Sequence, residues 1–389
     1  MVRDQLIIHE FRPVHLTVDR IGPFQENMYE LDFTNDQYKP CNFYMLVAAN
    51  GYGKTTLLDI MGSLLGMIDQ KEIEFFGHDD IDQGAGRAQL DVWIRCHWQG
   101  RDRRVIFSIL AGNLGEELSL KVWPKEELEK YNATSWHRLG HRKTATGPLT
   151  PLSTHKSDEL VREFLGFLRI CKKEVPRTFN ESIFPAPTTL CFSAYRDIPP
   201  MMESGPRRRV SQPYYWTYRS LHRFSEHNTE WPHSLDNLLV WFKWMDDGRF
   251  ERACQQVNKH VFARTPKYLK RVEKDPPEAV VEVNNGEKIS HPLCRLSSGE
   301  KNLTQLFLRI GAHMTRNTIL LIDEFDIHLH IRWQYRLLNA LKGLASQQDA
   351  NITVIVTTHS MEMLEVFTES LGVQEEGLQK GGHLIENLS

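Results

Sequence analysis

Two patterns of apolar residues recur along this chain and predict two kinds of β-strand. Continuous apolar runs are typical of strands buried on both faces of a parallel sheet. They occur at Phe43–Val47, Leu190–Tyr195, Thr318–Ile322 and Ile352–Thr358. Alternating stretches are typical of antiparallel strands with one exposed face. They occur at His15–Arg20, Met28–Phe33, Ala88–Ile94 and Val105–Ile109. We therefore expect an α/β fold with a mixed sheet flanked by helices and an antiparallel β subdomain.

Helical spacing of apolar residues separates these strands. One such stretch starts at Leu57, directly after a glycine-rich segment, and another carries Leu303, Leu306 and Phe307 on one side. Two further helices are expected in the middle of the chain. Ser157 is the expected N-cap of the first, which runs through Leu168, and Ser234 that of the second, which runs to Met245. The polar, turn-prone stretch at 140–148 is expected to be a mobile surface loop.

Composition narrows the class of protein. The chain has 389 residues, of which 41% are hydrophobic and 25% charged, as in ordinary globular proteins. Lys plus Arg number 47 against 50 for Asp plus Glu, so nucleic acid could be bound only through a local basic patch. The sequence has no membrane-spanning apolar run and no signal peptide, and its six cysteines are scattered without a C-x-x-C pair. A cytoplasmic location is expected.

The stretch from Ala48 to Thr56 has the residue pattern of a phosphate-binding loop. It lies between a buried strand and a helix, which is the context that this motif requires. Glycines allow the backbone to curl so that its N–H groups point at phosphate oxygens, a lysine supplies charge, and a threonine hydroxyl can ligate Mg²⁺. The nucleotide-binding residues expected here are Asn50, Gly51, Gly53, Lys54, Thr55 and Thr56. Ala48 replaces the usual first glycine, from which we expect slightly altered entry geometry and no loss of binding.

A second set of motifs lies in the last hundred residues. The run Thr318–Ile322 ends in Asp323, which would hold Mg²⁺ through water, and Glu324, which could polarise the attacking water or accept its proton. Upstream, Leu296-Ser297-Ser298-Gly299-Glu300 opens a helix, and downstream the last buried strand ends at His359. Each motif falls at a strand end or a helix start, where ligands of α/β proteins bind.

With these motifs in this order, the chain resembles the ABC-type ATPases of the group that contains RecF, Rad50, SMC and the overcoming-lysogenization-defect (OLD) ATPases. The resemblance covers roughly residues 10–110 and 285–389. It implies ATP and Mg²⁺ as cofactors, with Walker A at Lys54 and Walker B at Asp323. It also implies that Ser297 and Gly299 contact the γ-phosphate bound by a second protomer, that Asp326 lies at the dimer interface, and that His359 senses the phosphate.

The same resemblance implies a coordinating glutamine between the two halves. Gln83 and Gln89 are both candidates. It further implies that ATP closes a homodimer or a larger homo-oligomer and that hydrolysis releases it. A helix start alone stabilises an anion only modestly, so completing the site from a second subunit would couple nucleotide binding to association.

Within the group, the sequence favours a small ATPase. It lacks the sustained heptads of SMC and Rad50 coiled coils, and it ends too soon after His359 for the Toprim domain of OLD nucleases. The segment Ser193-Ala194-Tyr195-Arg196, with the Arg- and aromatic-rich stretch after it, is similar to bacterial defence ATPases of the Septu and PARIS type. Those ATPases work beside a separately encoded effector nuclease.

Four segments are expected. Residues 1–111 would form the N-terminal half of the ATPase with Walker A, and 112–187 a variable insertion with a mobile loop and a helix. Residues 188–284 would form a helical, Arg/aromatic-rich segment. Residues 285–389 would form the C-terminal half with the signature, Walker B, D-loop and switch histidine.

Three functions are compatible with these features. The first is an ATPase switch that controls a partner effector, most simply a nuclease, in anti-phage defence. The second is a RecF-like DNA-binding ATPase of repair, for which a basic aromatic segment could grip nucleic acid through Arg207, Arg208, Arg209 and Arg219. The third is a self-contained nuclease using Asp246-Asp247 or His227, but these residues read better as turn or structural residues. We therefore predict no intrinsic nuclease.

Overall fold

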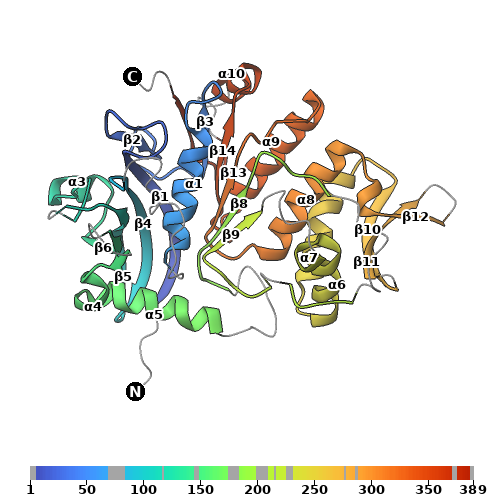
Figure 1. The fold of residues 1–389 in the computed structure, drawn as a ribbon, viewed down its shortest axis with the longest axis horizontal. Helices are drawn as coiled ribbons and strands as arrows, with labels where there is room; N and C mark the ends of the chain where they lie inside the picture. Colours follow the sequence, from blue (N-terminus) through green and yellow to red (C-terminus); the bar gives the residue numbers. More distant parts are fainter. Residues whose placement is uncertain are drawn as a thin grey trace.

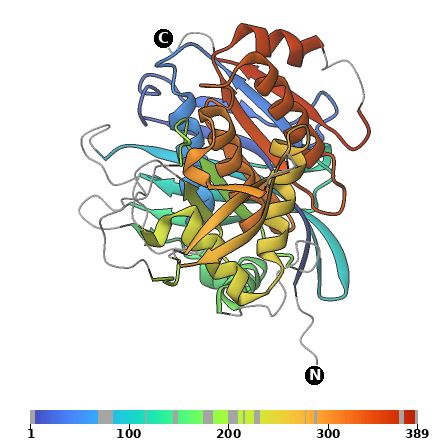
Figure 2. The ribbon, with the colours of Figure 1, turned by 90° about the vertical axis from the view of Figure 1, so that its right-hand side faces the viewer.

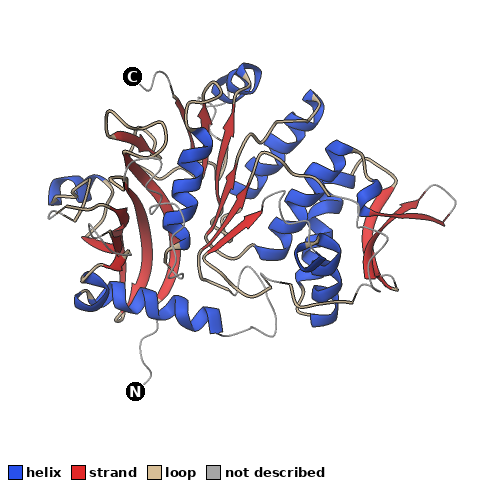
Figure 3. Ribbon diagram, in the orientation of Figure 1, coloured by secondary structure: helices blue, strands red, loops and turns tan. Residues whose placement is uncertain are grey.

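The strands form three sheets in the computed structural model (Figures 1 and 3). The model describes residues 6–68, 84–115, 118–143, 149–173, 184–198, 209–213, 216–224, 231–275, 277–284, 288–369 and 375–385. Gln83, Arg207, Arg208 and His227 lie outside the described residues, so their predicted roles stay predictions.

The first sheet has six strands in the order β2-β1-β4-β5-β6-β7. Its strands are β1 (Ile7–Asp19), β2 (Tyr29–Asp32), β4 (Arg87–Trp98), β5 (Arg101–Gly112), β6 (Ser135–Arg142) and β7 (Thr150–Pro151). All neighbours are antiparallel except β5 and β6, which run parallel. The antiparallel β subdomain expected from alternating apolar residues is therefore present, with β1, β4 and β5 longer and β2 shorter than the pattern predicts.

The segment 112–187, expected to be a variable insertion with a mobile loop and a helix, packs on the first sheet in its described parts. Its strand β6 extends the first sheet, and helices α3 (Lys125–Lys130), α4 (Thr154–Ser157) and α5 (Glu159–Lys173) lie against that sheet (Figure 1). The first residues of the expected surface loop, 140–142, belong to β6 instead, and residues 144–148 lie outside the described part of the chain. The N-cap role predicted for Ser157 is wrong, because Asp158 Oδ1 accepts the N–H groups of Leu160 and Val161.

The second sheet is entirely parallel and has the order β15-β3-β14-β13-β8-β9. Its strands are β3 (Phe43–Val47), β8 (Thr188–Phe192), β9 (Leu221–Phe224), β13 (Thr318–Ile322), β14 (Thr353–Thr358) and β15 (Lys380–Leu384). Each of the four continuous apolar runs forms one of these strands. The mixed α/β architecture predicted from the sequence is confirmed.

Helix α1 (Lys54–Gly66) lies between the two six-stranded sheets (Figure 1). Alternate residues of the parallel sheet enter two different cores, as β3 illustrates. Tyr44 and Leu46 pack toward α1 and the first sheet, whereas Phe43, Met45 and Val47 pack toward the helices on the far side. Burial on both faces explains why the run is apolar at every position.

The far face of the parallel sheet is covered by helices. They are α6 (Leu235–Met245), α7 (Arg249–Val257), α8 (Ser298–His313), α9 (Ile331–Ala345) and α10 (Met361–Glu369). Ser234 caps α6 as predicted, since its side chain accepts the Asn237 N–H. The segment expected to be helical up to residue 284 instead ends in strands: β10 (Lys267–Lys274), β11 (Pro277–Asn284) and β12 (Lys288–Pro292) form a third, antiparallel sheet (Figure 2).

Among the described residues, no helix combines the length and the apolar character needed to cross a bilayer.

Candidate nucleotide-binding site

The predicted motifs meet at one edge of the parallel sheet. Val47 at the end of β3 is in register with Thr358 at the end of β14, and Ile322 at the end of β13 is in register with both Val356 and Phe192. Because the carboxyl ends of parallel strands share an edge, the glycine-rich loop, the two acids and the switch histidine lie side by side.

The loop before α1 has the backbone that its glycines predict. Gly51 and Gly53 have φ values of 85° and 80°, which side chains rarely adopt. A Cβ atom on Gly53 would lie 2.7 Å from both Pro23 and Phe24, so the turn at the end of β1 closes over the loop. Ala48 is not among the residues with positive φ, which explains why alanine is tolerated at the first position of the motif.

Lys54 opens α1 and turns back into the loop. Its Nζ donates to the carbonyl oxygens of Ala48 at 2.7 Å and Ala49 at 2.9 Å. Burial lowers the pKa of Lys54, while the attraction of Glu324 and Asp323 opposes that shift. A lysine held over a loop by carbonyl oxygens is ready to exchange them for phosphate oxygens.

Asp323 connects the loop to the end of β13. Its Oδ2 accepts the Thr55 hydroxyl at 2.7 Å, and its Oδ1 accepts the Thr357 hydroxyl at 2.6 Å. Adjacent hydroxyl and carboxylate oxygens suit a hard cation such as Mg²⁺. The described residues contain no group of three or more metal-ligating side chains, so a cation here would take its other ligands from a nucleotide or from water.

Glu324 and His359 approach each other across the same edge. The Glu324 Oε1 lies 4.0 Å from the His359 Nδ1, and the histidine side chain is 45% exposed. Glu324 has a φ of 39°, and its N–H donates to the Thr357 hydroxyl at 2.7 Å. The two residues expected to act on the attacking water and the γ-phosphate are therefore neighbours, and both remain accessible.

Asp326 lies just beyond this pair. Its Oδ2 accepts the Thr358 hydroxyl at 2.8 Å, and the residue is 3% exposed. It lines a cleft of about 470 Å³ together with His328, His359 and Met361. Met361 is 61% exposed, so an apolar side chain stands at the rim of this polar cleft.

The signature residues begin α8. Ser297 is the N-cap of a complete capping box: its hydroxyl accepts the Glu300 N–H, and the Glu300 carboxylate accepts the Ser297 N–H. Glu300 is also held at 2.9 Å by Lys267 of β10. Ser297 itself is exposed, so the first turn of α8 offers free N–H groups to an anion from outside the chain.

Within the described part of the chain, no hydrogen bond or ion pair joins Ser297 or Gly299 to the phosphate-binding loop. The structure therefore brings together Lys54, Thr55, Asp323, Glu324 and His359, whereas none of the described polar contacts joins the signature residues to the loop.

Three supporting residues escaped the sequence analysis. Thr357 bridges Asp323 and Glu324, Lys267 holds the capping carboxylate, and Arg196 contacts the turn after β13. The position of Arg196 just after a buried strand was the available signal for that residue. Thr357 and Lys267 carry no motif that would have revealed them.

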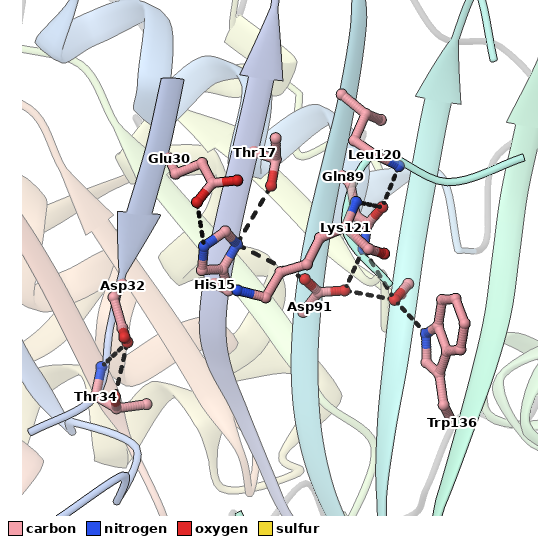
Figure 4. A network of polar contacts seen from close by, with 11 residues as sticks. His15, Thr17, Glu30, Asp32, Thr34, Gln89, Asp91, Leu120, Lys121 and Trp136 are labelled. Atoms are coloured by element: carbon pink, nitrogen blue, oxygen red, sulfur yellow. Dashed lines mark hydrogen bonds and ion pairs between the residues drawn. The ribbon is translucent and has the colours of Figure 1, made fainter. Parts of the chain in front are cut away.

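Gln89 does not serve as the coordinating glutamine. It is fully buried in β4, where its Nε2 donates to Asp91 Oδ1 and the Lys121 carbonyl, and its Oε1 accepts the N–H groups of Leu120 and Lys121 (Figure 4). Both ends of its amide are thus used inside the first sheet. Gln83 remains as a prediction.

The same network holds two buried titratable groups. Asp91 is fully buried, and burial raises the pKa of its carboxyl to about 6. His15 faces it, with Nδ1 3.8 Å from Asp91 Oδ2, and burial lowers the pKa of His15 to about 3 (Figure 4). The network lies within the first sheet and ties β1, β4 and β5 together.

The structure describes only some of the residues considered for the alternative functions. Asp246 ends α6 in a left-handed conformation, and Asp247 pairs with Arg249 at 2.6 Å, so these acids have structural roles. Of the four arginines expected to contact nucleic acid, the structure describes two: Arg209 is exposed and Arg219 is half-buried beside β8. Nucleic-acid binding by this segment therefore stays a prediction.

Part of the chain matches a known family model, and its fold can be aligned with solved structures. Residues 200–365, less than half of the chain, match a family model described as an "AAA domain" associated with the AbiEii toxin and a "Type IV TA system". A solved SMC head bound to the C-winged helix domain of ScpA aligns with 91% of each chain, at 14% identity and a TM-score of 0.45.

Curated relatives match only a part of the chain. The "Retron Ec83 probable ATPase" of Escherichia coli is 32% identical over 104 residues, which are 24% of this chain and 18% of that protein. The "Retron Vc95 probable ATPase" of Vibrio cholerae is 31% identical over 109 residues, or 25% of this chain and 20% of that protein. UvrABC system protein A of Thermus thermophilus is 29% identical over 98 residues, which are 25% of this chain and 10% of that protein. The chain thus aligns with a fifth or less of each of these relatives, and the names of the two retron proteins support an ATPase domain.

Proposed function

We propose that this protein is an ATP-binding and ATP-hydrolysing switch that assembles through ATP and controls a partner effector. The observation that supports the proposal is the hydrogen bond between Thr55, the residue after Lys54, and Asp323, since these are the two residues predicted to hold Mg²⁺. Glu324 and His359 complete a hydrolytic arrangement at the same strand ends.

In this proposal each residue has a defined task. Lys54 and the N–H groups of the loop bind the β- and γ-phosphates, with Asn50, Gly51, Gly53 and Thr56 shaping the loop. Mg²⁺, held by Thr55 and through water by Asp323, would neutralise charge on the phosphates. Glu324 accepts a proton from the attacking water, and His359 donates a hydrogen bond to the γ-phosphate.

The signature residues act on a second copy of the chain. Ser297 and Gly299 lie at an exposed helix start, and a helix start favours an anion. In a two-fold symmetric dimer each helix start would meet the γ-phosphate of the partner subunit, with Asp326 near the contact. ATP would then stabilise the dimer, and hydrolysis would release it.

A defence role is supported by the retron ATPases among the relatives, two of which match with about the same identity. On this basis we propose that the effector is a separately encoded protein, most simply a nuclease. UvrABC system protein A among the relatives favours a second candidate, a DNA-binding ATPase of repair. That candidate predicts that duplex DNA raises ATP turnover and that the effect falls steeply with salt.

The test is the solution mass of Glu324→Gln, measured by light scattering with and without ATP and Mg²⁺. A mass that doubles with ATP supports the proposed assembly. The double variant Lys54→Ala/Glu324→Gln is the matched control and should not change mass. A mass that ATP leaves unchanged, although the nucleotide is bound, contradicts ATP-driven assembly.

A further inference from the structure

Arg196 is a buried arginine whose five N–H donors are all used. The residue is 5% exposed. Its Nε donates to Asn302 Oδ1 at 3.1 Å, and its Nη1 donates to the carbonyl oxygens of Ser193 at 2.8 Å and Asp323 at 2.9 Å. Its Nη2 donates to the carbonyl oxygens of Glu324 at 3.1 Å and Phe325 at 3.2 Å. A guanidinium has five donors, so this one has none left for a phosphate.

These bonds join three elements. Ser193 follows β8, the residues from Asp323 to Phe325 follow β13, and Asn302 lies in α8, the helix that the signature residues begin. Arg196 thus connects the signature helix directly to the segment that carries the predicted catalytic acid. Burying a charge costs free energy unless its partners are good, so an arginine fixed by five acceptors strongly restrains the backbone around it.

The restrained backbone is an unfavourable one. Glu324 has a φ of 39°, in the left-handed region, which is unfavourable for a residue with a side chain. Its N–H is held by the Thr357 hydroxyl at 2.7 Å and its carbonyl oxygen by Arg196 at 3.1 Å. The N–H and the carbonyl group of Glu324 are therefore each held by a hydrogen bond, and the direction of the Glu324 side chain depends on these two bonds.

We propose that Arg196 is a positioning residue for ATP hydrolysis, which holds Glu324 in its left-handed conformation and links it to the signature helix through Asn302. The inference rests on the proposed ATPase function. Arg196 itself would not contact the nucleotide, because all five of its N–H donors are used inside the protein. Movement at the start of α8, where the partner's phosphate would bind, would reach Glu324 through this side chain.

The test compares the kcat for ATP hydrolysis with the Kd for a fluorescent ATP analogue in purified full-length variants. Arg196→Lys keeps the charge but cannot reach five acceptors. It is expected to lower kcat at least about tenfold, because misplacing a catalytic group by about 1 Å can cost up to about a hundredfold. Its Kd should stay within about twofold of the wild type, since Lys54 and its loop are untouched.

Arg249→Lys is the matched control. Arg249 is 2% exposed and makes several hydrogen bonds, among them to Asp247 at 2.6 Å, but it lies in α7, away from the strand ends. This change should lower the melting temperature and leave kcat of the folded protein unchanged. If both variants lose kcat equally, Arg196 is only structural and the inference is overturned.

If Arg196→Lys does not fold, the Asn302→Ala variant tests instead whether Arg196 positions Glu324. It removes one acceptor and leaves the four carbonyl bonds of Arg196 in place, so a loss of kcat at unchanged Kd supports the link to α8. A wild-type kcat in either folded variant overturns the inference. Wild-type protein that binds ATP but does not hydrolyse it would contradict the proposed function instead.

Discussion

The hydroxyl of Thr55 lies 2.7 Å from Oδ2 of Asp323, although the two residues are 268 positions apart in the chain. This bond joins the first turn of α1 to the end of β13. The described segments between them include most of the first sheet and α5–α8, and the two halves of the site still meet. The pair therefore marks where binding and hydrolysis of a nucleotide would be coupled.

Replacing Lys54 by Ala is expected to abolish nucleotide binding. Lys54 is a buried positive charge that interacts with the carboxylates of Glu324, Asp323 and Asp326, and without it those acids would repel a triphosphate more strongly. Equilibrium binding of a fluorescent ATP analogue measures the effect, with a circular dichroism melt as the control for folding. An affinity within about twofold of the wild type would show that another group binds the phosphates.

Glu324→Gln should bind ATP normally and hydrolyse it at least about a hundredfold more slowly, because an amide cannot accept the proton of the attacking water. The backbone bonds of residue 324 to Thr357 and Arg196 do not involve the side chain and should survive. Release of phosphate under single-turnover conditions measures the rate. Near-normal turnover would mean that a different group serves as the base.

Gly299→Asp tests whether the signature acts on a partner subunit. Gly299 has no positive φ, and a Cβ there would meet nothing closer than 3.8 Å, so the fold should tolerate the change while the added charge repels phosphate. Gly299→Asp and Lys54→Ala should each be inactive alone. Mixed in equal amounts, they should recover up to about a quarter of wild-type activity, because half of the dimers are mixed and each has one intact site.

Gly343→Asp is the control for that experiment, since it adds the same charge to α9 at a glycine with open space around it. It should keep wild-type activity. If the mixture of Gly299→Asp and Lys54→Ala stays inactive although mixed dimers form, the sites are not shared between subunits.

Asp91→Asn should stabilise the protein at pH 8 and have little effect at pH 4. Burial raises the pKa of the Asp91 carboxyl from 3.8 to about 6, so the stability it contributes in its protonated form is lost as the pH rises through that window. A shift of this size corresponds to about 3 kcal/mol, which the neutral amide would recover at pH 8. Thermal unfolding at both pH values measures the difference.

His15 must be considered in the same experiment. Burial lowers its pKa from 6.5 to about 3, so its contribution to stability is lost as the pH falls through that range. Each variant is therefore compared with wild type at the same pH, with the exposed Asp36→Asn as a control. Equal destabilisation by Asp91→Asn at both pH values would mean that its hydrogen bonds to Gln89 and Ser108 matter more than its charge.

The sequence predicts this site well because its residues stand at the ends of apolar runs. Phe43–Val47 and Thr318–Ile322 form β3 and β13 with the predicted bounds, and the parallel sheet then aligns Lys54 with Asp323. The third sheet was missed, because β10 carries mostly charged residues and shows no alternation of apolar side chains. One of its contacts, the ion pair of Lys267 with Glu300, reaches the start of α8, and no local pattern reveals it.

The burial of Gln89 and the capping of α5 were missed for a similar reason. A glutamine in an alternating strand looks like an exposed polar residue until the neighbouring strands supply partners for its amide. Ser157 and Asp158 are both good N-cap residues, and only the bonds from Leu160 and Val161 distinguish them. In each case tertiary contacts decide between choices that the local sequence leaves nearly equal.

The left-handed backbone at Glu324 implies a trade between stability and activity at one position. Asparagine adopts this conformation more readily than longer side chains, so Glu324→Asn should melt at a higher temperature than Glu324→Gln, although both lack the charge. Selection for folding alone would therefore favour a different residue here. On the proposed function, the carboxylate of Glu324 accounts for a residue that local stability alone would not favour at this point of the chain.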